Sequence, residues 1–354
     1  MTCPQTIVID ARLWGRTGIG RYVKELCTHL PRVDAGLRLV MAGAADEARS
    51  AGQVAPYDAA LYSLREQWWG GGFFRSLGPA DLWHFPHYNV PVRPPTPFVV
   101  TVHDLIHFKF PQMFGRGKVF IASRMLKRAA GMAGAIICPS ESTRRDLAEM
   151  LPQAAGKITV IPNGVSEAFR PVAADQIAAA SKSLGLDAYI ICMGDRKPYK
   201  GFKAARQCFE RLAAEYPGLK LVSVGQRSDD GGDIIQCGYV DDEHLRLLYA
   251  GARCLLFPSA YEGFGLPVLE AMACGCPVVC GRGSSLDEVC GQAALQVDVS
   301  DPAALAEAVK QTLRDDVARE LAAKGLAQAA KYTWGNTARQ VASLYRQVCD
   351  QPRL

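Results

Sequence analysis

Residues 257–279, with the sequence FPSAYEGFGLPVLEAMACGCPVV, decide the fold of this chain. An apolar run that ends at Phe257 predicts a buried strand, and the pattern then breaks at Gly263 and Gly265. A helical pattern resumes from Pro267, whose fixed φ and missing N–H suit the first turn of a helix. A strand, loop and helix in this order bring backbone N–H groups and the positive end of a helix dipole together. The stretch therefore predicts an anion site.

Two carboxylates flank the predicted anion site, Glu262 in the loop and Glu270 in the first turn of the helix. Carboxylates repel a phosphate, so we expect both to accept hydrogen bonds from neutral hydroxyls instead. A phosphate flanked by sugar hydroxyls describes a nucleotide sugar. The plainer alternative leaves Glu262 in water and lets Glu270 stabilise its own helix N-terminus, which is worth under about 1 kcal/mol.

Composition indicates a soluble globular protein of two domains, because the chain has 354 residues, 49% of them hydrophobic and 21% charged. No apolar run is long enough for a membrane span, and TIVID near the N-terminus predicts a first core strand rather than an export signal. The twelve cysteines lack metal-site spacing, so we expect buried thiols in a reducing cytoplasm. The net charge of +5 permits contact with a polyanion without requiring it, and we expect no nucleic-acid partner.

Strand-like and helical stretches alternate along the whole chain, which predicts an α/β protein with parallel sheets. The strand-like stretches are TIVID, LRLVMAG, DLWHF, PFVVTVHD, AIICPS, ITVIPNG, YIICMG, LKLVSVG and CLLFPS. The rhythm breaks after residue 161 and restarts at Tyr189. We therefore expect one Rossmann-like domain over residues 1–168 and a second over 172–334, with the ligand in a cleft between them.

A glycine-rich stretch follows the first predicted strand and contains Gly15, Gly18 and Gly20 at the start of a helix. Such a helix N-terminus suits a phosphate or a polar sugar. A dinucleotide site would need a third glycine where Val23 stands, so we exclude an NAD(P) site.

Histidines follow two of the predicted strands. His103 ends the strand that begins near Val100, and we expect it to hydrogen-bond a hydroxyl of the transferred sugar. His84, His87 and His107 either line the acceptor side or cap strand ends. The spacing of His84, His87 and His103 does not resemble a zinc pattern, and we expect no metal.

Three cations, Arg196, Lys197 and Lys200, follow the strand YIICMG. Their density points to a polyanion, since Asp195 is the one acidic neighbour in sequence. A diphosphate leaving group would need such a clamp, because its charge grows as the glycosidic bond breaks.

Two segments leave membrane contact open. Residues 113–128 combine five basic with seven large apolar side chains, and residues 68–74 carry four aromatic side chains around three glycines. Either they meet anionic lipid, or they form an amphipathic helix and an aromatic loop that pack on the core.

The string EGFGLPVLEAMACGCPVV, with seven residues between Glu262 and Glu270, closely resembles the E-x7-E motif of retaining glycosyltransferases of family 4. That resemblance implies the GT-B fold: two Rossmann-like domains facing each other across a cleft, with a C-terminal helix (335–354) that crosses back to complete the N-terminal domain. In this family the first glutamate contacts the transferred sugar and the second holds the ribose diol.

The resemblance also implies roles for particular residues. Catalytic roles fall to His103, Arg196, Lys200 and Glu262. Donor contacts fall to Gly18, Gly20, Lys197, Tyr239, Val240, Gly263, Phe264, Gly265, Leu266 and Glu270, with Tyr239 and Val240 beside the nucleobase. Family members usually carry a longer stretch or an adjacent Arg-Lys pair in the clamp, so Lys197 can replace Arg196 or Lys200 there.

The implied activity is metal-independent, retaining transfer of a hexose from a nucleotide sugar, with no cofactor. RTGIGRY, SLREQ, HFPHYNVP and VTVHDLIHFKFP resemble bacterial mannosyl- and rhamnosyltransferases of lipopolysaccharide O-antigen and exopolysaccharide synthesis. This similarity implies a GDP-sugar donor, a glycan or lipid-linked glycan acceptor, and a cytoplasmic enzyme with peripheral contact at the inner membrane. The alternatives are a UDP-sugar donor, a sugar-nucleotide 2-epimerase of the same fold, and a non-catalytic sugar-nucleotide sensor.

Overall fold

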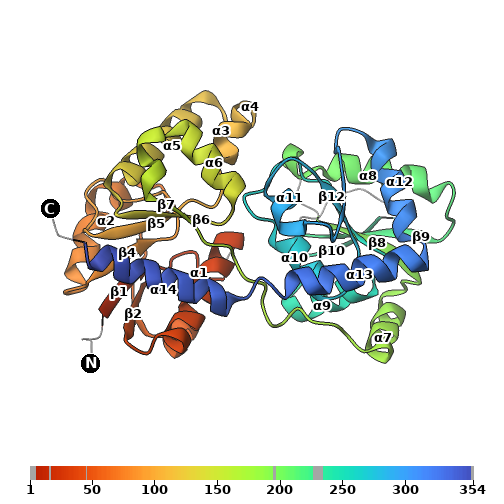
Figure 1. The fold of residues 1–354 in the computed structure, drawn as a ribbon, viewed down its shortest axis with the longest axis horizontal. Helices are drawn as coiled ribbons and strands as arrows, with labels where there is room; N and C mark the ends of the chain where they lie inside the picture. Colours follow the sequence, from red (N-terminus) through yellow and green to blue (C-terminus); the bar gives the residue numbers. More distant parts are fainter. Residues whose placement is uncertain (1–4, 16, 45, 194–196, 226–233, 352–354) are drawn as a thin grey trace. The chain divides into compact units, whose positions relative to one another are not determined.

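The computed structural model describes residues 5–15, 17–44, 46–193, 197–225 and 234–351. The chain divides into two compact units: unit 1 comprises residues 1–164 and 333–354, and unit 2 comprises residues 165–332. Each unit contains a parallel β-sheet with helices around it (Figure 1), which confirms the predicted pair of Rossmann-like domains.

Unit 1 is built on a 7-stranded sheet in the order β3-β2-β1-β4-β5-β6-β7. The strands are β1 (Gln5–Asp10), β2 (Leu37–Ala42), β3 (Gln53–Ala55), β4 (Leu82–Phe85), β5 (Phe98–Thr101), β6 (Ala135–Cys138) and β7 (Ile158–Val160). The helices are α1 (Thr17–Val33), α2 (Leu64–Ser76), α3 (Ile106–Lys109), α4 (Pro111–Phe114), α5 (Arg116–Met132), α6 (Glu141–Met150) and α14 (Trp334–Cys349), with short 3-10 turns η1 (Asp46–Ser50) and η2 (Pro152–Lys157).

Helix α14 belongs to unit 1 although it follows unit 2 in the chain. It begins at Trp334, where the Thr333 side chain accepts a hydrogen bond from the Asn336 backbone N–H as an N-cap. It packs along α1, as Figure 1 shows. Its Tyr345 is fully buried and reaches β4. This is the C-terminal helix that the family resemblance implied would complete the first domain.

Unit 2 is built on a 6-stranded sheet in the order β10-β9-β8-β11-β12-β13. The strands are β8 (Ala188–Met193), β9 (Leu219–Val224), β10 (Ile234–Gly238), β11 (Leu255–Phe257), β12 (Val278–Gly281) and β13 (Leu295–Val297). The described helices are α7 (Ala174–Leu184), α8 (Phe202–Ala213), α9 (Asp242–Gly251), α10 (Leu266–Ala273), α11 (Ser285–Cys290), α12 (Pro302–Thr312) and α13 (Asp315–Ala329), with the 3-10 turn η3 (Pro198–Lys200).

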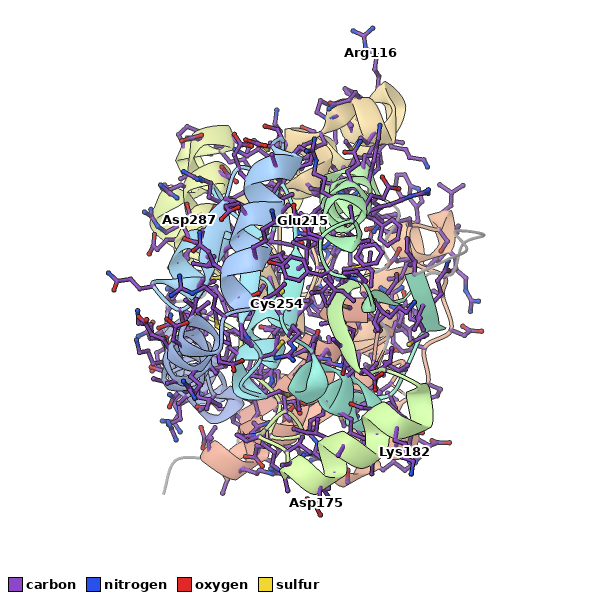
Figure 2. The ribbon with its side chains drawn as sticks, turned by 90° about the vertical axis from the view of Figure 1, so that its right-hand side faces the viewer. Arg116, Asp175, Lys182, Glu215, Cys254 and Asp287 are labelled. Atoms are coloured by element: carbon purple, nitrogen blue, oxygen red, sulfur yellow. The ribbon has the colours of Figure 1, made fainter. Side chains whose placement is uncertain are left out.

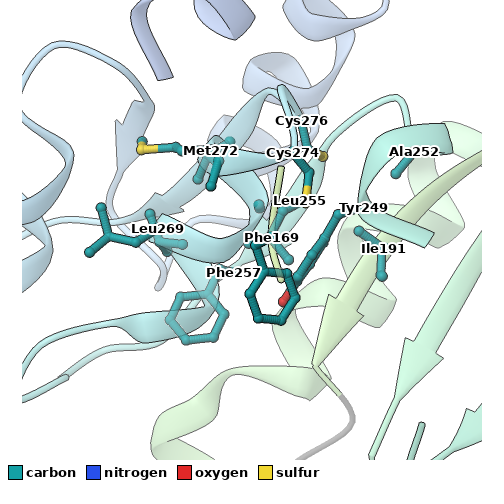
Figure 3. Close-up of a cluster of buried hydrophobic side chains, with 14 of the residues drawn as sticks. Phe169, Ile191, Tyr249, Ala252, Leu255, Phe257, Leu269, Met272, Cys274 and Cys276 are labelled. Carbon is teal, nitrogen blue, oxygen red and sulfur yellow. The ribbon is translucent and has the colours of Figure 1, made fainter. Parts of the chain in front are cut away.

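The central strands of unit 2 are apolar on both faces because helices cover both sides of the sheet. In β8, Tyr189 and Ile191 pack into one core, while Ile190 and Cys192 pack into a second core on the opposite face. Figure 3 shows part of the first core, where the rings of Phe169 and Tyr249 lie next to each other. A strand buried on both faces explains why YIICMG reads as a continuous apolar run.

Buried cysteines behave as small apolar side chains in these sheets. Cys254, just before β11, is fully buried, and burial raises the pKa of its thiol to about 12. Such a thiol stays protonated at neutral pH and is a poor nucleophile.

Helix α2 corrects the prediction of an aromatic loop at residues 68–74. The three glycines lie inside the helix. Two of them pack so closely against neighbouring atoms that a side chain would not fit. A Cβ on Gly71 would lie 1.8 Å from the Arg93 carbonyl oxygen, and one on Gly70 would lie 2.9 Å from the Tyr57 hydroxyl. Close backbone packing therefore outweighs the low helix propensity of glycine.

Among the described helices, none combines the length and the hydropathy that crossing a bilayer would require.

Candidate functional site

The two central strands of the unit 2 sheet, β8 and β11, carry the predicted site residues in the loops at their carboxyl ends. The strand order reverses between them. From β8 the sheet continues through β9 to β10 on one side, and from β11 it continues through β12 to β13 on the other side. Ligands of open α/β sheets bind at such a switch point. The topology thus brings together residues near 197–201 and 258–265, which are far apart in sequence.

Lys200 and Glu262 form an ion pair across these two loops. The Lys200 Nζ donates hydrogen bonds to Glu262 Oε1 at 2.8 Å and Oε2 at 3.0 Å. Their side chains are 22% and 12% exposed, so the pair is shielded from most of the solvent. The sequence predicted a phosphate clamp and a sugar ligand at these positions but not that they would bind each other.

Backbone packing fixes the spacing of this ion pair. Gly201 has a φ of +73°, and a Cβ there would lie 1.9 Å from the Pro258 carbonyl oxygen. The Ala260 N–H donates to the Tyr199 carbonyl oxygen at 2.8 Å, and the buried Ser259 hydroxyl shares its proton between that oxygen at 3.3 Å and the Tyr261 carbonyl oxygen at 3.2 Å. The loop after β8 is therefore fastened to the loop after β11 on both sides of Lys200.

Helix α10 begins at Leu266, with Pro267 in its first turn as predicted and Gly265 as a left-handed N-cap residue. Glu270 is the fifth residue of this helix, so its predicted place in the first turn is wrong. Its side chain is 5% exposed, and a buried carboxylate beyond the first turn contributes little to the helix dipole. This geometry argues against the plainer alternative, in which Glu270 only stabilises the N-terminus of its own helix.

Ser285 contacts the Glu262 loop, and sequence reasoning did not predict this contact. It is the first residue of α11, it is fully buried, and its hydroxyl donates to the Glu262 carbonyl oxygen at 2.8 Å. The Ser-Ser pair at 284–285 is visible in the sequence. Because serine often caps helices, the pair predicts a helix N-cap but no contact with the Glu262 loop. The structure adds that this helix start holds the Glu262 loop.

The other predicted donor contacts in unit 2 have mixed environments. Phe264 is 6% exposed and packs into the core, and Leu266 is half-buried against the same core. Tyr239 follows the edge strand β10 and is 88% exposed, while Val240 packs partly on the core. Gly263 lies in the loop beside Glu262.

The predicted clamp is described only in part. Lys197 is exposed and its ammonium lies 5.9 Å from the centroid of the Tyr199 ring, at the start of η3. Arg196, with Asp195, lies outside the described residues. The cations placed at the switch point by the described structure are therefore Lys197 and Lys200.

In unit 1, His103 follows β5 and holds a defined tautomer. Its Nε2–H donates to the Pro86 carbonyl oxygen at 2.9 Å, which leaves Nδ1 as the acceptor nitrogen. Its ring meets the Tyr22 ring edge-on at 4.9 Å. Burial lowers the pKa of His103 to about 4, so the imidazole is neutral at pH 7 and can accept a hydrogen bond from a sugar hydroxyl.

The remaining strand-end histidines have separate roles. His84 is fully buried, and its two ring nitrogens bond the Tyr345 hydroxyl at 2.6 Å and the Thr101 hydroxyl at 2.8 Å. His84 therefore ties α14 to the sheet. His87 stacks on Tyr88 at 4.3 Å. Within the described ranges, no group of three His, Cys, Asp or Glu side chains gathers as metal ligands would.

The two glycines assigned to donor binding in unit 1 lie in the first turn of α1 rather than in a loop before it. A Cβ on Gly20 would lie 1.9 Å from the Leu13 carbonyl oxygen, so packing alone requires this glycine. A Cβ on Gly18 would meet nothing within 4 Å. Among the described residues, nothing therefore blocks approach to Gly18.

A buried polar cluster at the carboxyl ends of β1 and β4 was also missed. Arg12 bonds both Asp10, at 2.8 Å from Nε, and the fully buried Glu66, whose carboxylate also accepts two hydrogen bonds of 2.8 Å from Asn89. Burial alone would lower the pKa of Arg12, but the hydrogen bonds and charges of Asp10 and Glu66 outweigh it and raise that pKa. Asp10 at a strand end was the sequence signal for this cluster.

Each of the two units matches a known protein family. Residues 16–169 match the family described as Glycosyltransferase Family 4, and residues 187–315 match the family described as Glycosyl transferases group 1. The O-antigen chain mannosyltransferase B of Escherichia coli is 33% identical over 285 residues, which cover 75% of this chain and 74% of that protein.

Two solved structures share the fold. Sucrose-phosphate synthase from Thermosynechococcus elongatus has a TM-score of 0.78 and 23% identity, over 97% of this chain and 99% of that one. HepE from Anabaena, solved in complex with UDP-glucose, has a TM-score of 0.75 and 17% identity, over 97% and 99%.

Proposed function

The chain belongs to the glycosyltransferases of family 4 and group 1, and we propose that it transfers mannose or rhamnose from a GDP-sugar to a glycan or lipid-linked glycan of a bacterial surface polysaccharide. The relative that is 33% identical is an O-antigen mannosyltransferase, which supports the sugar and the pathway class. The enzyme would act on the cytoplasmic face of the inner membrane.

One observation carries this proposal: Lys200 and Glu262 are paired at the switch point of the unit 2 sheet, beside the start of α10. In the absence of ligand the two charges neutralise each other. A nucleoside diphosphate would attract Lys200, and Glu262 would then accept hydrogen bonds from the hydroxyls of the transferred sugar. The buried Glu270 would accept hydrogen bonds from the ribose hydroxyls.

The proposed chemistry needs charge stabilisation more than a nucleophile. As the bond between the sugar C1 and the phosphate oxygen breaks, negative charge grows on the departing diphosphate. Lys200, Lys197 and the N-terminus of α10 would stabilise that charge, together with Arg196. His103 would offer its Nδ1 as acceptor to a substrate hydroxyl.

We propose that the anomeric configuration is retained. The acceptor oxygen would attack C1 on the face from which the diphosphate departs, forming the new C1–O bond as the old one breaks. The acceptor hydroxyl proton would pass to the departing phosphate oxygen. This route requires neither a bound metal nor a side-chain base behind C1.

A UDP-sugar donor is the second candidate, favoured by the structural likeness to HepE bound to UDP-glucose. A panel of GDP, UDP, ADP and TDP in thermal unfolding without added metal separates the two, because a ligand that binds only the native state raises the melting temperature. We expect GDP to give the largest rise, and a larger rise with UDP would reverse the donor assignment.

Substitutions then test the two glutamates. We expect Glu262→Gln to lower transfer by about 100-fold or more while GDP binds as tightly as before or tighter, because Lys200 loses its intramolecular partner. We expect Glu270→Gln to weaken GDP binding by about tenfold. Release of the nucleotide with epimerisation of the sugar, in the absence of an acceptor, would instead indicate a 2-epimerase.

Glu320→Gln is the matched control for both substitutions, since Glu320 forms an exposed ion pair with Lys324 on α13. This variant should bind and transfer like the wild type. If Glu262→Gln and Glu270→Gln also transferred like the wild type, the proposed donor site would be wrong. NMR of the product anomeric proton would test retention.

A further inference from the structure

Helix α2 of unit 1 presents large apolar side chains to the solvent. Leu64, Trp68 and Trp69 are 75%, 62% and 68% exposed. The opposite face of the same helix is buried through Glu66, Gly70, Gly71 and Phe74. An ordinary surface helix has the reverse arrangement, with polar residues outward. The outward face of α2 is therefore an apolar surface that the folding of unit 1 does not explain.

Helix α5 adds two exposed apolar residues and a dense positive charge. Phe120 and Ile121 are 62% and 58% exposed. The helix sequence, RGKVFIASRMLKRAAGM, contains five Lys or Arg residues and no Asp or Glu. Figure 2 shows the first of them, Arg116, projecting away from the ribbon. Arg124 lies over the Phe120 ring, with 5.7 Å from its guanidinium carbon to the ring centroid.

A side-chain contact joins the two helices into one surface. The Arg128 guanidinium of α5 donates to the Gln67 Oε1 of α2 at 2.7 Å and to the Val90 carbonyl oxygen at 2.6 Å. Gln67 is the neighbour of Trp68, and Arg128 is one turn beyond Arg124. We define the α2/α5 surface by ten exposed residues of the two helices: Leu64, Arg65, Trp68, Trp69, Arg116, Lys118, Phe120, Ile121, Arg124 and Lys127.

A pocket of about 240 Å³ opens at the α2 side of this surface, lined by Pro56, Tyr57, Asp58, Arg65, Trp69, Gly70 and Phe73. The rings of Tyr57 and Phe73 stack at 4.0 Å and form part of its wall. The surface therefore combines protruding aromatic rings with a recess that has an exposed ion pair at its edge, in which Arg65 Nη1 lies 3.3 Å from Asp58 Oδ1.

We propose that the α2/α5 surface docks unit 1 on an anionic lipid bilayer. Tryptophan and phenylalanine rings are suited to the boundary between headgroups and acyl chains, and lysine and arginine side chains are attracted to anionic headgroup phosphates. The charge also argues against self-association through this face. Two copies meeting face to face would bring two α5 helices of five positive charges each together.

Vesicle binding of the full chain without nucleotide tests this proposal independently of donor and acceptor. The protein is sedimented with vesicles of phosphatidylcholine alone and with vesicles in which roughly one lipid in three is phosphatidylglycerol. We expect binding to the anionic vesicles and little to the neutral ones. Equal binding to both, or to neither, would overturn the proposal.

Three variants locate the contact. Trp68→Ser/Trp69→Ser removes the largest rings, and Lys118→Glu/Arg124→Glu/Lys127→Glu reverses the charge on α5. Lys182→Glu/Lys203→Glu/Lys331→Glu makes the same charge change on exposed residues of unit 2. We expect both surface variants to lower the vesicle partition coefficient by about tenfold or more, and the unit 2 control to change it less than about threefold.

Circular dichroism and thermal unfolding would confirm that the variants fold, as expected for exposed positions. An equal loss of binding in the unit 2 control would show that net charge alone decides binding, and would overturn the proposal. A lipid-free dimer that Trp68→Ser/Trp69→Ser dissociates would assign the surface to a second copy of the chain instead.

Discussion

At the residue scale, the two glycines of the first turn of α1 have different reasons to be glycine. A methyl group on Gly20 would collide with the Leu13 carbonyl oxygen, whereas Gly18 faces open space. We expect Gly20→Ala to lower the free energy of unfolding by about 1–3 kcal/mol through overpacking. Gly18→Ala should leave it equal or slightly higher, since alanine favours helices. Urea unfolding of the two variants measures both effects.

Gly18→Ala also separates packing from ligand contact. A variant that is as stable as the wild type but has a raised KM for the donor would assign ligand approach to Gly18. Equal destabilisation by both substitutions would contradict the geometry at the start of α1.

Lys200 and Glu262 show what could be predicted at this scale and what could not. Both residues were assigned to the site from local sequence, because each follows a strand in a loop of suitable composition. Their ion pair was not predicted, since they are 62 residues apart and meet only because β8 and β11 are neighbours in the sheet. Strand order is a long-range property that local patterns do not encode.

At the scale of elements, Glu66 anchors α2 to the carboxyl end of the unit 1 sheet. Its buried carboxylate accepts hydrogen bonds from Arg12, Asn89 and the Tyr62 backbone N–H. We expect Glu66→Gln to lower the free energy of unfolding by about 3 kcal/mol, because it leaves Arg12 less well compensated in a buried position. The melting temperature and the urea midpoint measure this loss.

Glu47→Gln is the matched control, because Glu47 is exposed on η1 of the same unit. Its effect should stay within about 0.5 kcal/mol. A similarly small effect of Glu66→Gln would mean that the buried cluster does not hold α2.

The same helix marks a limit of sequence reasoning about elements. Three consecutive glycines normally disfavour a helix by about 1 kcal/mol each, so residues 68–74 read as a loop. The helix forms because Ser63 caps it, Glu66 is anchored and the Arg93 backbone packs directly on Gly71. Four strands are absent from the predicted stretches: β3, β10, β12 and β13. β3 and β13 are only three residues long. β7 and β11 are equally short but were predicted, because they lie within the longer apolar stretches ITVIPNG and CLLFPS.

At the scale of the whole molecule, buried neutral histidines should make stability depend on pH. Burial lowers the pKa of His84 to about 3, while the unfolded chain titrates near its ordinary value of 6.5. Between these values the unfolded state binds more protons than the native state, so protonation favours unfolding. His84 stabilises the native state most above pH 6.5, and the loss is about 1.4 kcal/mol per pH unit as the pH falls below it.

Urea unfolding between about pH 7 and about pH 4.5 checks this sign, with His84→Gln as the comparison. We expect the slope of unfolding free energy against pH to be shallower in the variant by about 1.4 kcal/mol per pH unit, which corresponds to one proton. Carboxylates titrate in both proteins and cancel in the difference. An unchanged slope would mean that His84 is protonated in the native state.

Most of the architecture could be predicted at this largest scale. The alternation of apolar runs gave the parallel sheets, and the break after residue 161 gave two units. The family resemblance added the returning helix, which no local pattern requires. Trp334 and Tyr345 read as ordinary apolar positions, and only the structure shows that Tyr345 bonds His84 on β4. That contact spans 261 residues of sequence.

The placement of α14 determines the order in which the chain can mature on the ribosome. Unit 2 is one continuous stretch, residues 165–332, whereas unit 1 needs α14, which is synthesised after it. Domains usually fold in the order of their synthesis. Here the later-made unit 2 can be complete while the earlier one still exposes the side of α1 that α14 covers. A nascent chain stalled after residue 332 would therefore present that side of α1, with its buried Leu26 and Leu30 nearby, to chaperones and proteases.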